Sequence, residues 1–146
     1  MLSMNQIYKT LAVINVLAIL TTIYLTYLHF VPEASDICNL SEKWNCEIVN
    51  KSIYSELFGI PVSILGMAAY LAFLTFSLLG LRRNLKKWTP YFLAAVAGGT
   101  AFALYLTGIE TFVLRTYCVF CVVQQILILI ELYLAYRLYT LTRRHA

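Results

Sequence analysis

Long runs without a charged side chain constrain this chain more than any other feature of its sequence. Three of them, Thr10 to Pro32, Leu57 to Leu81 and Trp88 to Ile109, hold 23, 25 and 22 residues. A fourth run, Thr116 to Ile130, holds 15 residues and continues as an apolar stretch beyond a single acidic residue. A helix that crosses the hydrocarbon core of a bilayer needs about 20 predominantly apolar residues. The sequence therefore predicts a membrane protein.

The composition agrees with this prediction. The chain is 61% hydrophobic and 12% charged, whereas soluble domains carry about 25% charged residues. We expect an all-α fold, a bundle of four transmembrane helices at about 8–30, 60–81, 90–113 and 117–140. The polar loop 31–59 between the first two helices is expected to form an extracytoplasmic cap. At this length, 1–146 is expected to form a single domain.

The distribution of charge predicts the orientation in the membrane. The second connection and the C-terminal segment are basic, with Arg82, Arg83, Lys86, Lys87, Arg137, Arg143 and Arg144. The first loop is acidic overall, with Glu33, Asp36, Glu42, Glu47 and Glu56 against Lys43 and Lys51. Because positive residues stay in the cytoplasm, we expect a multi-pass plasma or inner membrane protein with both termini cytoplasmic. The net charge of +4 is then an orientation signal, and we expect no nucleic-acid partner.

All four cysteines fall on the outer side in this topology. Cys38 and Cys46 lie in the outer loop, and Cys118 and Cys121 begin the fourth helix at its outer end. The outer side is the oxidising compartment, where disulfides persist. Cys118 and Cys121 share one helix face, and a position near a helix N-terminus lowers the pKa of a cysteine. The pattern predicts a dithiol that cycles with its disulfide, and the polar loop pair is suited to exchange with a soluble partner.

The cysteines allow two other interpretations. One is a non-enzymatic membrane scaffold held by two static disulfides. The other is a zinc site with four cysteine ligands. Such ligands normally come as two pairs, with about 2–4 residues between the two cysteines of each pair. Seven residues separate Cys38 from Cys46, so this spacing fits zinc poorly and we expect no metal.

The order of these features resembles the vitamin K epoxide reductase family and its prokaryotic homologues. Four spans, an outer-loop cysteine pair and Cys-X-X-Cys at the start of the last helix follow one another in both. Cys46-Glu-Ile-Val-Asn-Lys-Ser52 is similar to the family's Cys-x-x-Val-x-x-Ser stretch. Phe58-Gly59-Ile60-Pro61 resembles the Phe-Gly that leads into its second helix, with the Ile-Pro of prokaryotic members. The resemblance covers essentially the whole chain. The other four-span bacterial disulfide oxidase places Cys-X-X-Cys before its loop pair, the reverse of the order here.

The resemblance implies a membrane thiol-disulfide oxidoreductase. Such an enzyme couples disulfide formation in an exported redox partner to reduction of a quinone of the menaquinone, ubiquinone or vitamin K type, bound within the helix bundle. By the resemblance, Cys121 faces the quinone and Cys118 is its resolving partner. Cys46 exchanges with Cys118, and Cys38 passes the disulfide to the external partner. The four spans fill this chain, so we expect a separate thioredoxin-like exported protein as that partner.

The resemblance also gives candidate quinone contacts. Ser52 matches a serine next to the family's active site, and Phe58 belongs to the Phe-Gly motif. Ser55 and Gln125 stand where vertebrate members carry an asparagine and a tyrosine, and Phe120 is a candidate for stacking on the ring. The differences at 55 and 125 favour a plain quinone acceptor. Reduction of vitamin K epoxide or quinone by partner thiols is the alternative.

Two acidic residues lie within the expected spans, where carboxylates are costly and often functional. Glu131 follows Cys121 by ten residues, or roughly 15 Å along a helix. We therefore expect Glu131 to make a paired or protonated contact in the bundle. For Glu110, near the outer end of the third helix, we expect a side chain that reaches the membrane interface, with proton delivery as the alternative.

Overall fold

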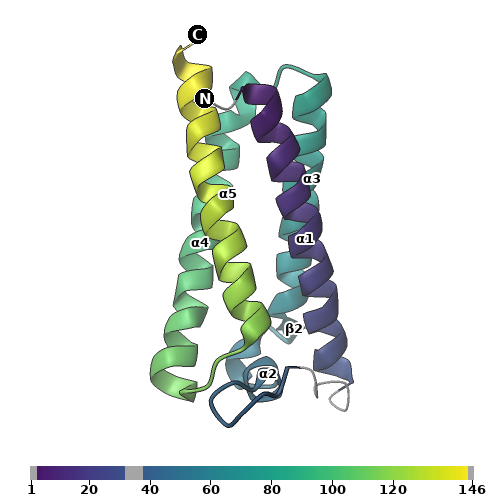
Figure 1. The fold of residues 1–146 in the computed structure, drawn as a ribbon, viewed down its shortest axis with the longest axis vertical. Coiled ribbons are helices and arrows are strands. Elements are labelled where there is room, and N and C mark those ends of the chain that lie inside the picture. Colours follow the sequence, from purple (N-terminus) through teal and green to yellow (C-terminus); the bar gives the residue numbers. More distant parts are fainter. Residues whose placement is uncertain (1–2, 32–37, 145–146) are drawn as a thin grey trace.

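Four long helices run side by side in the computed structural model, which describes residues 3–31 and 38–144. They are α1 (Met4–Phe30), α3 (Val62–Arg82), α4 (Thr89–Ile109), which the π-helix η4 (Glu110–Leu114) continues, and α5 (Val119–Arg144) (Figure 1). The described residues contain four spans long and apolar enough to cross a membrane. The prediction of an all-α protein with four transmembrane helices is confirmed, and the chain is a multi-pass membrane protein. Part of the expected outer loop, with Glu33 and Asp36, lies outside the described residues.

Short elements between α1 and α3 form a cap at one end of the bundle. They are α2 (Cys46–Asn50), the 3-10 helix η2 (Ile53–Ser55), β1 (Glu56–Leu57) and β2 (Ile60–Pro61). The two strands pair antiparallel, with Glu56 opposite Pro61. The beginning of α1 and the end of α5 lie at the other end of the bundle (Figure 1). The 3-10 helix η3 (Lys86–Trp88) connects α3 to α4.

The apolar core is densest in the half of the bundle away from the cap. Its buried side chains come from all four long helices: Ile7, Leu11 and Ala18 of α1, Tyr70 and Phe73 of α3, Phe92 and Val96 of α4, and Ala135 and Leu138 of α5. Phe76 stacks on Phe92 with ring centroids 4.2 Å apart, which joins α3 to α4. Closer to the cap, the four long helices enclose a cavity.

Hydrogen bonds between polar side chains also connect the helices inside the bundle. Asn15 of α1 donates a hydrogen bond of 2.8 Å to Glu131 of α5, and both side chains are fully buried. The Thr26 hydroxyl of α1 donates one of 2.9 Å to Ser63 of α3. Hydrogen bonds of this kind help to hold membrane helices together, where no hydrophobic effect acts between them. The expectation that Glu131 makes a paired contact within the bundle is therefore confirmed.

Candidate active site

Backbone hydrogen bonds join the cap to the start of α5. Trp44 and Tyr117 form an isolated parallel β-bridge. The Asn45 N–H donates to the Tyr117 carbonyl at 3.0 Å, and the Tyr117 N–H donates to the Lys43 carbonyl at 2.8 Å. The Trp44 and Tyr117 rings lie 5.5 Å apart. This pairing holds the chain just before Cys46 against the residue that precedes Cys118.

The short helix α2 places the outer disulfide. Asn45 caps the helix, because its side chain accepts a hydrogen bond of 3.1 Å from the Ile48 N–H. Cys46 is the first residue of α2, and it forms a disulfide with Cys38 across a Cα–Cα distance of 5.6 Å. That separation lies in the usual range for a disulfide. The predicted pairing of these two cysteines is confirmed, and both are buried.

The outer disulfide meets the Cys-X-X-Cys motif directly. Cys118 Sγ lies 3.0 Å from Cys46 Sγ, and the sulfurs of Cys38, Cys46 and Cys118 all lie within 4.8 Å of one another. Three such sulfurs have the composition of a metal site. Two of them are joined in the disulfide, however, so they do not act as thiolate ligands. The arrangement instead fits thiol-disulfide exchange, in which a thiolate attacks a disulfide sulfur.

The environment of Cys118 favours its reactive form. A hydrogen bond with the Cys121 thiol lowers the pKa of Cys118, and backbone N–H groups at the start of α5 act in the same direction. Burial and the nearby Glu110 carboxyl oppose this effect. The lowered pKa agrees with the sequence analysis, although the neighbouring thiol contributes more than the helix N-terminus does. A lower pKa increases the fraction of thiolate, which is the nucleophile in disulfide exchange.

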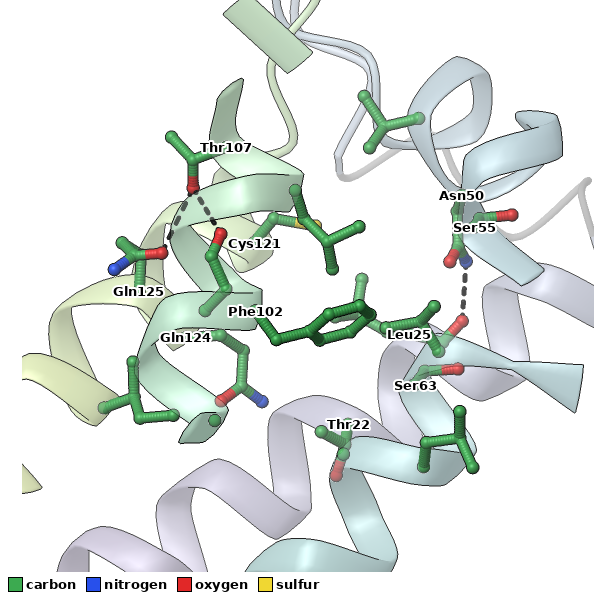
Figure 2. A pocket seen from close by; sticks show the side chains of 18 of the residues that line it. Thr22, Leu25, Asn50, Ser55, Ser63, Phe102, Thr107, Cys121, Gln124 and Gln125 are labelled. Carbon is green, nitrogen blue, oxygen red and sulfur yellow. Dashed lines mark hydrogen bonds between the residues drawn. The ribbon is translucent and has the colours of Figure 1, made fainter. Parts of the chain in front are cut away.

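A cavity of about 260 Å³ borders Cys121. Figure 2 shows it from close by, with Asn50 and Ser55 of the cap on one side and Thr107 and Cys121 on the other. All four long helices and the cap contribute to its wall, which is mostly apolar and includes Leu25, Val49, Leu65, Phe73, Phe102, Leu106 and Ile128. Cys121 therefore borders an apolar space inside the bundle.

A few polar groups interrupt this apolar wall. The Thr107 hydroxyl donates to Gln125 Oε1 at 3.1 Å. Gln125 Nε2 is buried and has no hydrogen-bond partner within residues 3–31 and 38–144. On the cap side, Asn50 Nδ2 donates to the Leu25 carbonyl at 2.6 Å. Small-molecule sites commonly combine an apolar lining with a few such groups that fix orientation.

The residues expected to contact a quinone divide into two groups. Ser52, Ser55 and Gln125 line the cavity. Phe58 does not, because it lies beside Gly59 in the turn between β1 and β2, with a positive φ of 54° and 97% of its surface exposed. Phe120 also lies outside the wall, since its ring packs against Tyr24 with centroids 4.7 Å apart.

Several residues that line the cavity were not singled out from the sequence as quinone contacts. Asn50, Thr107 and Gln124 belong to this group. Asn50 stands at an unspecified position of the Cys46–Ser52 motif, and Thr107 and Gln124 stand in no motif. Glu110 also lines the cavity and is only 6% exposed. The expectation that its side chain reaches the membrane interface is wrong, because the turn after α4 directs it toward Cys118.

A sequence model described as the vitamin K epoxide reductase family matches residues 9–136. The matched range contains all four cysteines and most of the four long helices.

Proposed function

The chain belongs to the vitamin K epoxide reductase family, and we propose that it carries electrons from the thiols of an exported protein to a quinone. As a member of this family, the chain is a quinone-linked oxidoreductase of the membrane. The observation that best supports a disulfide relay is the 3.0 Å between Cys118 Sγ and Cys46 Sγ. Cys121, the other end of the motif, borders the apolar cavity.

The four cysteines divide the transfer into two exchange steps. The exported partner's dithiol reduces the Cys38–Cys46 disulfide, and its own two sulfurs become a disulfide. The Cys46 thiolate then attacks Cys118 of an oxidised Cys118–Cys121 pair, which releases Cys121. The Cys38 thiolate attacks Cys46, releases Cys118 and restores the outer disulfide. This leaves a reduced Cys118 and Cys121 beside an intact Cys38–Cys46 disulfide.

The residues around the cavity fit a quinone. A bound quinone supplies an acceptor for two electrons and two protons. Its flat ring needs an apolar space, and its carbonyl oxygens need hydrogen-bond donors. The wall offers apolar side chains from several helices and Gln125 Nε2, a buried donor without a partner in the described part of the chain. Ser52 and Ser55 also line the cavity on the cap side, where their hydroxyls donate to the carbonyls of Val49 and Ser52.

The cap faces outward in this proposal, and both termini face the cytoplasm. The basic residues between α3 and α4 and at the end of α5 support this orientation by the positive-inside rule. The outer disulfide then lies on the side of the membrane where an exported, thioredoxin-like partner is found. The acceptor is a menaquinone, a ubiquinone or a vitamin K type quinone dissolved in the bilayer.

Purified protein in nanodiscs tests the proposal. A reduced thioredoxin-like domain serves as the donor, a short-chain ubiquinone or menaquinone as the acceptor, and quinone absorbance as the readout. We expect turnover by the wild type and by Thr75→Ala, a control at an exposed position on α3. Cys121→Ala should stop quinone reduction and leave the donor reduced. Normal turnover by Cys121→Ala would falsify the relay.

The same preparation separates the alternatives. Reduction of vitamin K epoxide with consumption of the dithiol would assign the same site to a different acceptor, as an epoxide reductase. A protein whose thiol count does not change with added quinone or donor would be a scaffold with a static disulfide. The short distance between Cys118 and the outer disulfide favours exchange over a static role.

A further inference from the structure

Glu110 places a buried carboxyl between the reactive cysteines and the cavity. Its side chain is 6% exposed. Oε2 accepts a hydrogen bond of 3.3 Å from the Cys118 N–H. The carboxyl also lies close enough to the Cys121 thiol to interact with it, and it lines the cavity together with Cys121. Glu110 therefore contacts both residues of the dithiol and the space beside them.

The backbone at the end of α4 fixes this position. The α-helical pattern stops at Ile109, and Glu110 begins the π-helix η4. The Glu110 carbonyl accepts hydrogen bonds from the N–H groups of Arg115 and Thr116. Arg115 has a positive φ of 51°, which turns the chain back toward the bundle. Wide turns of this type are frequent at functional sites, and here the turn brings Cys118 against the carboxyl.

Within residues 3–31 and 38–144, no salt bridge balances the charge of Glu110. Among the described residues the salt bridges join His29 to Glu56 and Lys51 to Glu47, and none includes Glu110. A buried carboxylate without a cation depends on nearby N–H and S–H donors for its stability. Transfer of a proton from a neighbouring thiol neutralises it. Glu110 is thus suited to hold a proton for part of a reaction cycle.

We propose that Glu110 is the proton-transfer residue for oxidation of the Cys118–Cys121 dithiol. This inference rests on the proposed function, in which a quinone in the cavity is the acceptor. Two S–H bonds break, one S–S bond forms and two electrons reach the quinone. Glu110 accepts the Cys121 proton and delivers it to one ring oxygen. The Cys118 proton leaves to solvent, and the second ring oxygen is protonated from solvent.

Three variants separate proton transfer from a structural role. Glu110→Gln keeps an acceptor oxygen for the Cys118 N–H but carries no titratable proton. We expect its kcat for quinone reduction to fall about 100-fold, within the range for loss of a general acid or base, with little change in KM. Glu110→Asp should recover most of the rate. Glu42→Gln, at an exposed carboxyl on the cap, should match the wild type.

A second readout requires no quinone. The reduced wild type is oxidised with diamide, and infrared difference spectra are recorded with ¹³C-labelled glutamate. We expect a carboxyl band that changes on dithiol oxidation in the wild type and in Glu42→Gln, and that is absent from Glu110→Gln. A wild-type spectrum without a glutamate band would overturn the proposal, even if the glutamine variant failed to fold.

The outcomes also distinguish this inference from the relay itself. If Cys121→Ala stops turnover while Glu110→Gln keeps the wild-type kcat, the relay stands and the role of Glu110 is refuted. If Cys121→Ala turns over normally, the relay fails first. A Glu110→Asp variant as slow as Glu110→Gln, with no glutamate band in the wild type, would identify a purely structural carboxyl.

Discussion

Replacement of Glu131 by leucine should destabilise the bundle, because Asn15 and Glu131 complete each other's hydrogen bonds at its centre. Asn15 Nδ2 donates to Glu131 Oε1 and to the Leu11 carbonyl, each at 2.8 Å. Asn15 Oδ1 and Glu131 Oε2 are buried and lack a further partner within the described residues. A neutral carboxylic acid at Glu131 carries a donor on Oε2, whereas Asn15 Oδ1 is an acceptor.

The size of the effect follows from these contacts. A hydrogen bond between membrane helices contributes about 0.6 kcal/mol on average and at most about 1.7 kcal/mol. A buried polar group left without its partner costs about 1–3 kcal/mol. We therefore expect Glu131→Leu to lower the free energy of unfolding by about 1–3 kcal/mol. Glu131→Gln keeps one donor and one acceptor, so its loss should stay below about 1 kcal/mol.

Reversible unfolding in mixed micelles measures these changes. A double-mutant cycle with Asn15→Leu isolates the pair, because removal of both partners leaves neither unsatisfied. We expect the double variant to lose less than the sum of the single variants, with a coupling energy of about 0.6–1.7 kcal/mol. Equal losses for Glu131→Gln and Glu131→Leu, or single effects that simply add, would refute the paired contact.

Three further outcomes are expected. The thiol of Cys121 lowers the pKa of Cys118, so Cys121→Ala should raise that pKa. The pH midpoint for exchange of Cys118 with the outer disulfide then moves upward, whereas Cys121→Ser keeps a hydrogen-bond donor and should shift the midpoint less. Quenched-flow alkylation measures the midpoint in each variant. An unchanged midpoint would show that the Cys121 thiol does not lower the pKa of Cys118. Gln125→Leu removes a donor from the cavity wall and should raise the KM for quinone about tenfold, the equivalent of about 1.4 kcal/mol; an unaltered KM would exclude Gln125 as a contact. An impermeant maleimide should label Glu42→Cys in intact cells and Lys87→Cys only after permeabilisation, and the opposite pattern would reverse the orientation.

The four helices, and where the cysteines lie relative to them, could be predicted from the sequence because both depend on local patterns. Uncharged apolar runs predict spans whatever their neighbours are. The bounds shift by a few residues, as at α1, where the Ser3 capping box starts the helix at Met4. The pairing of Cys38 with Cys46 followed from a shared polar loop on the outer side.

Other features of the site depend on contacts between distant parts of the chain. The resemblance implied that Cys46 meets Cys118, but the bridge of Trp44 to Tyr117 that brings them together depends on backbone pairing that no residue type indicates. The burial of Glu110 follows from a π-helical turn, and a lone glutamate near a helix end does not predict that turn. Motif resemblance placed Phe58 near the quinone, yet its backbone turn exposes it.

The most direct measurement is capture of the disulfide that joins the two cysteine pairs. With Cys38→Ala and Cys121→Ala combined, only Cys46 and Cys118 remain, and their sulfurs need to close from 3.0 Å to about 2.05 Å. Mild oxidation in membranes should link them almost completely, as read by mass spectrometry of the joined peptides. The reciprocal variant, which keeps Cys38 and Cys121, should link far less. If Cys46 and Cys118 stay unlinked, or if both variants link equally, electrons do not pass between the pairs by this route.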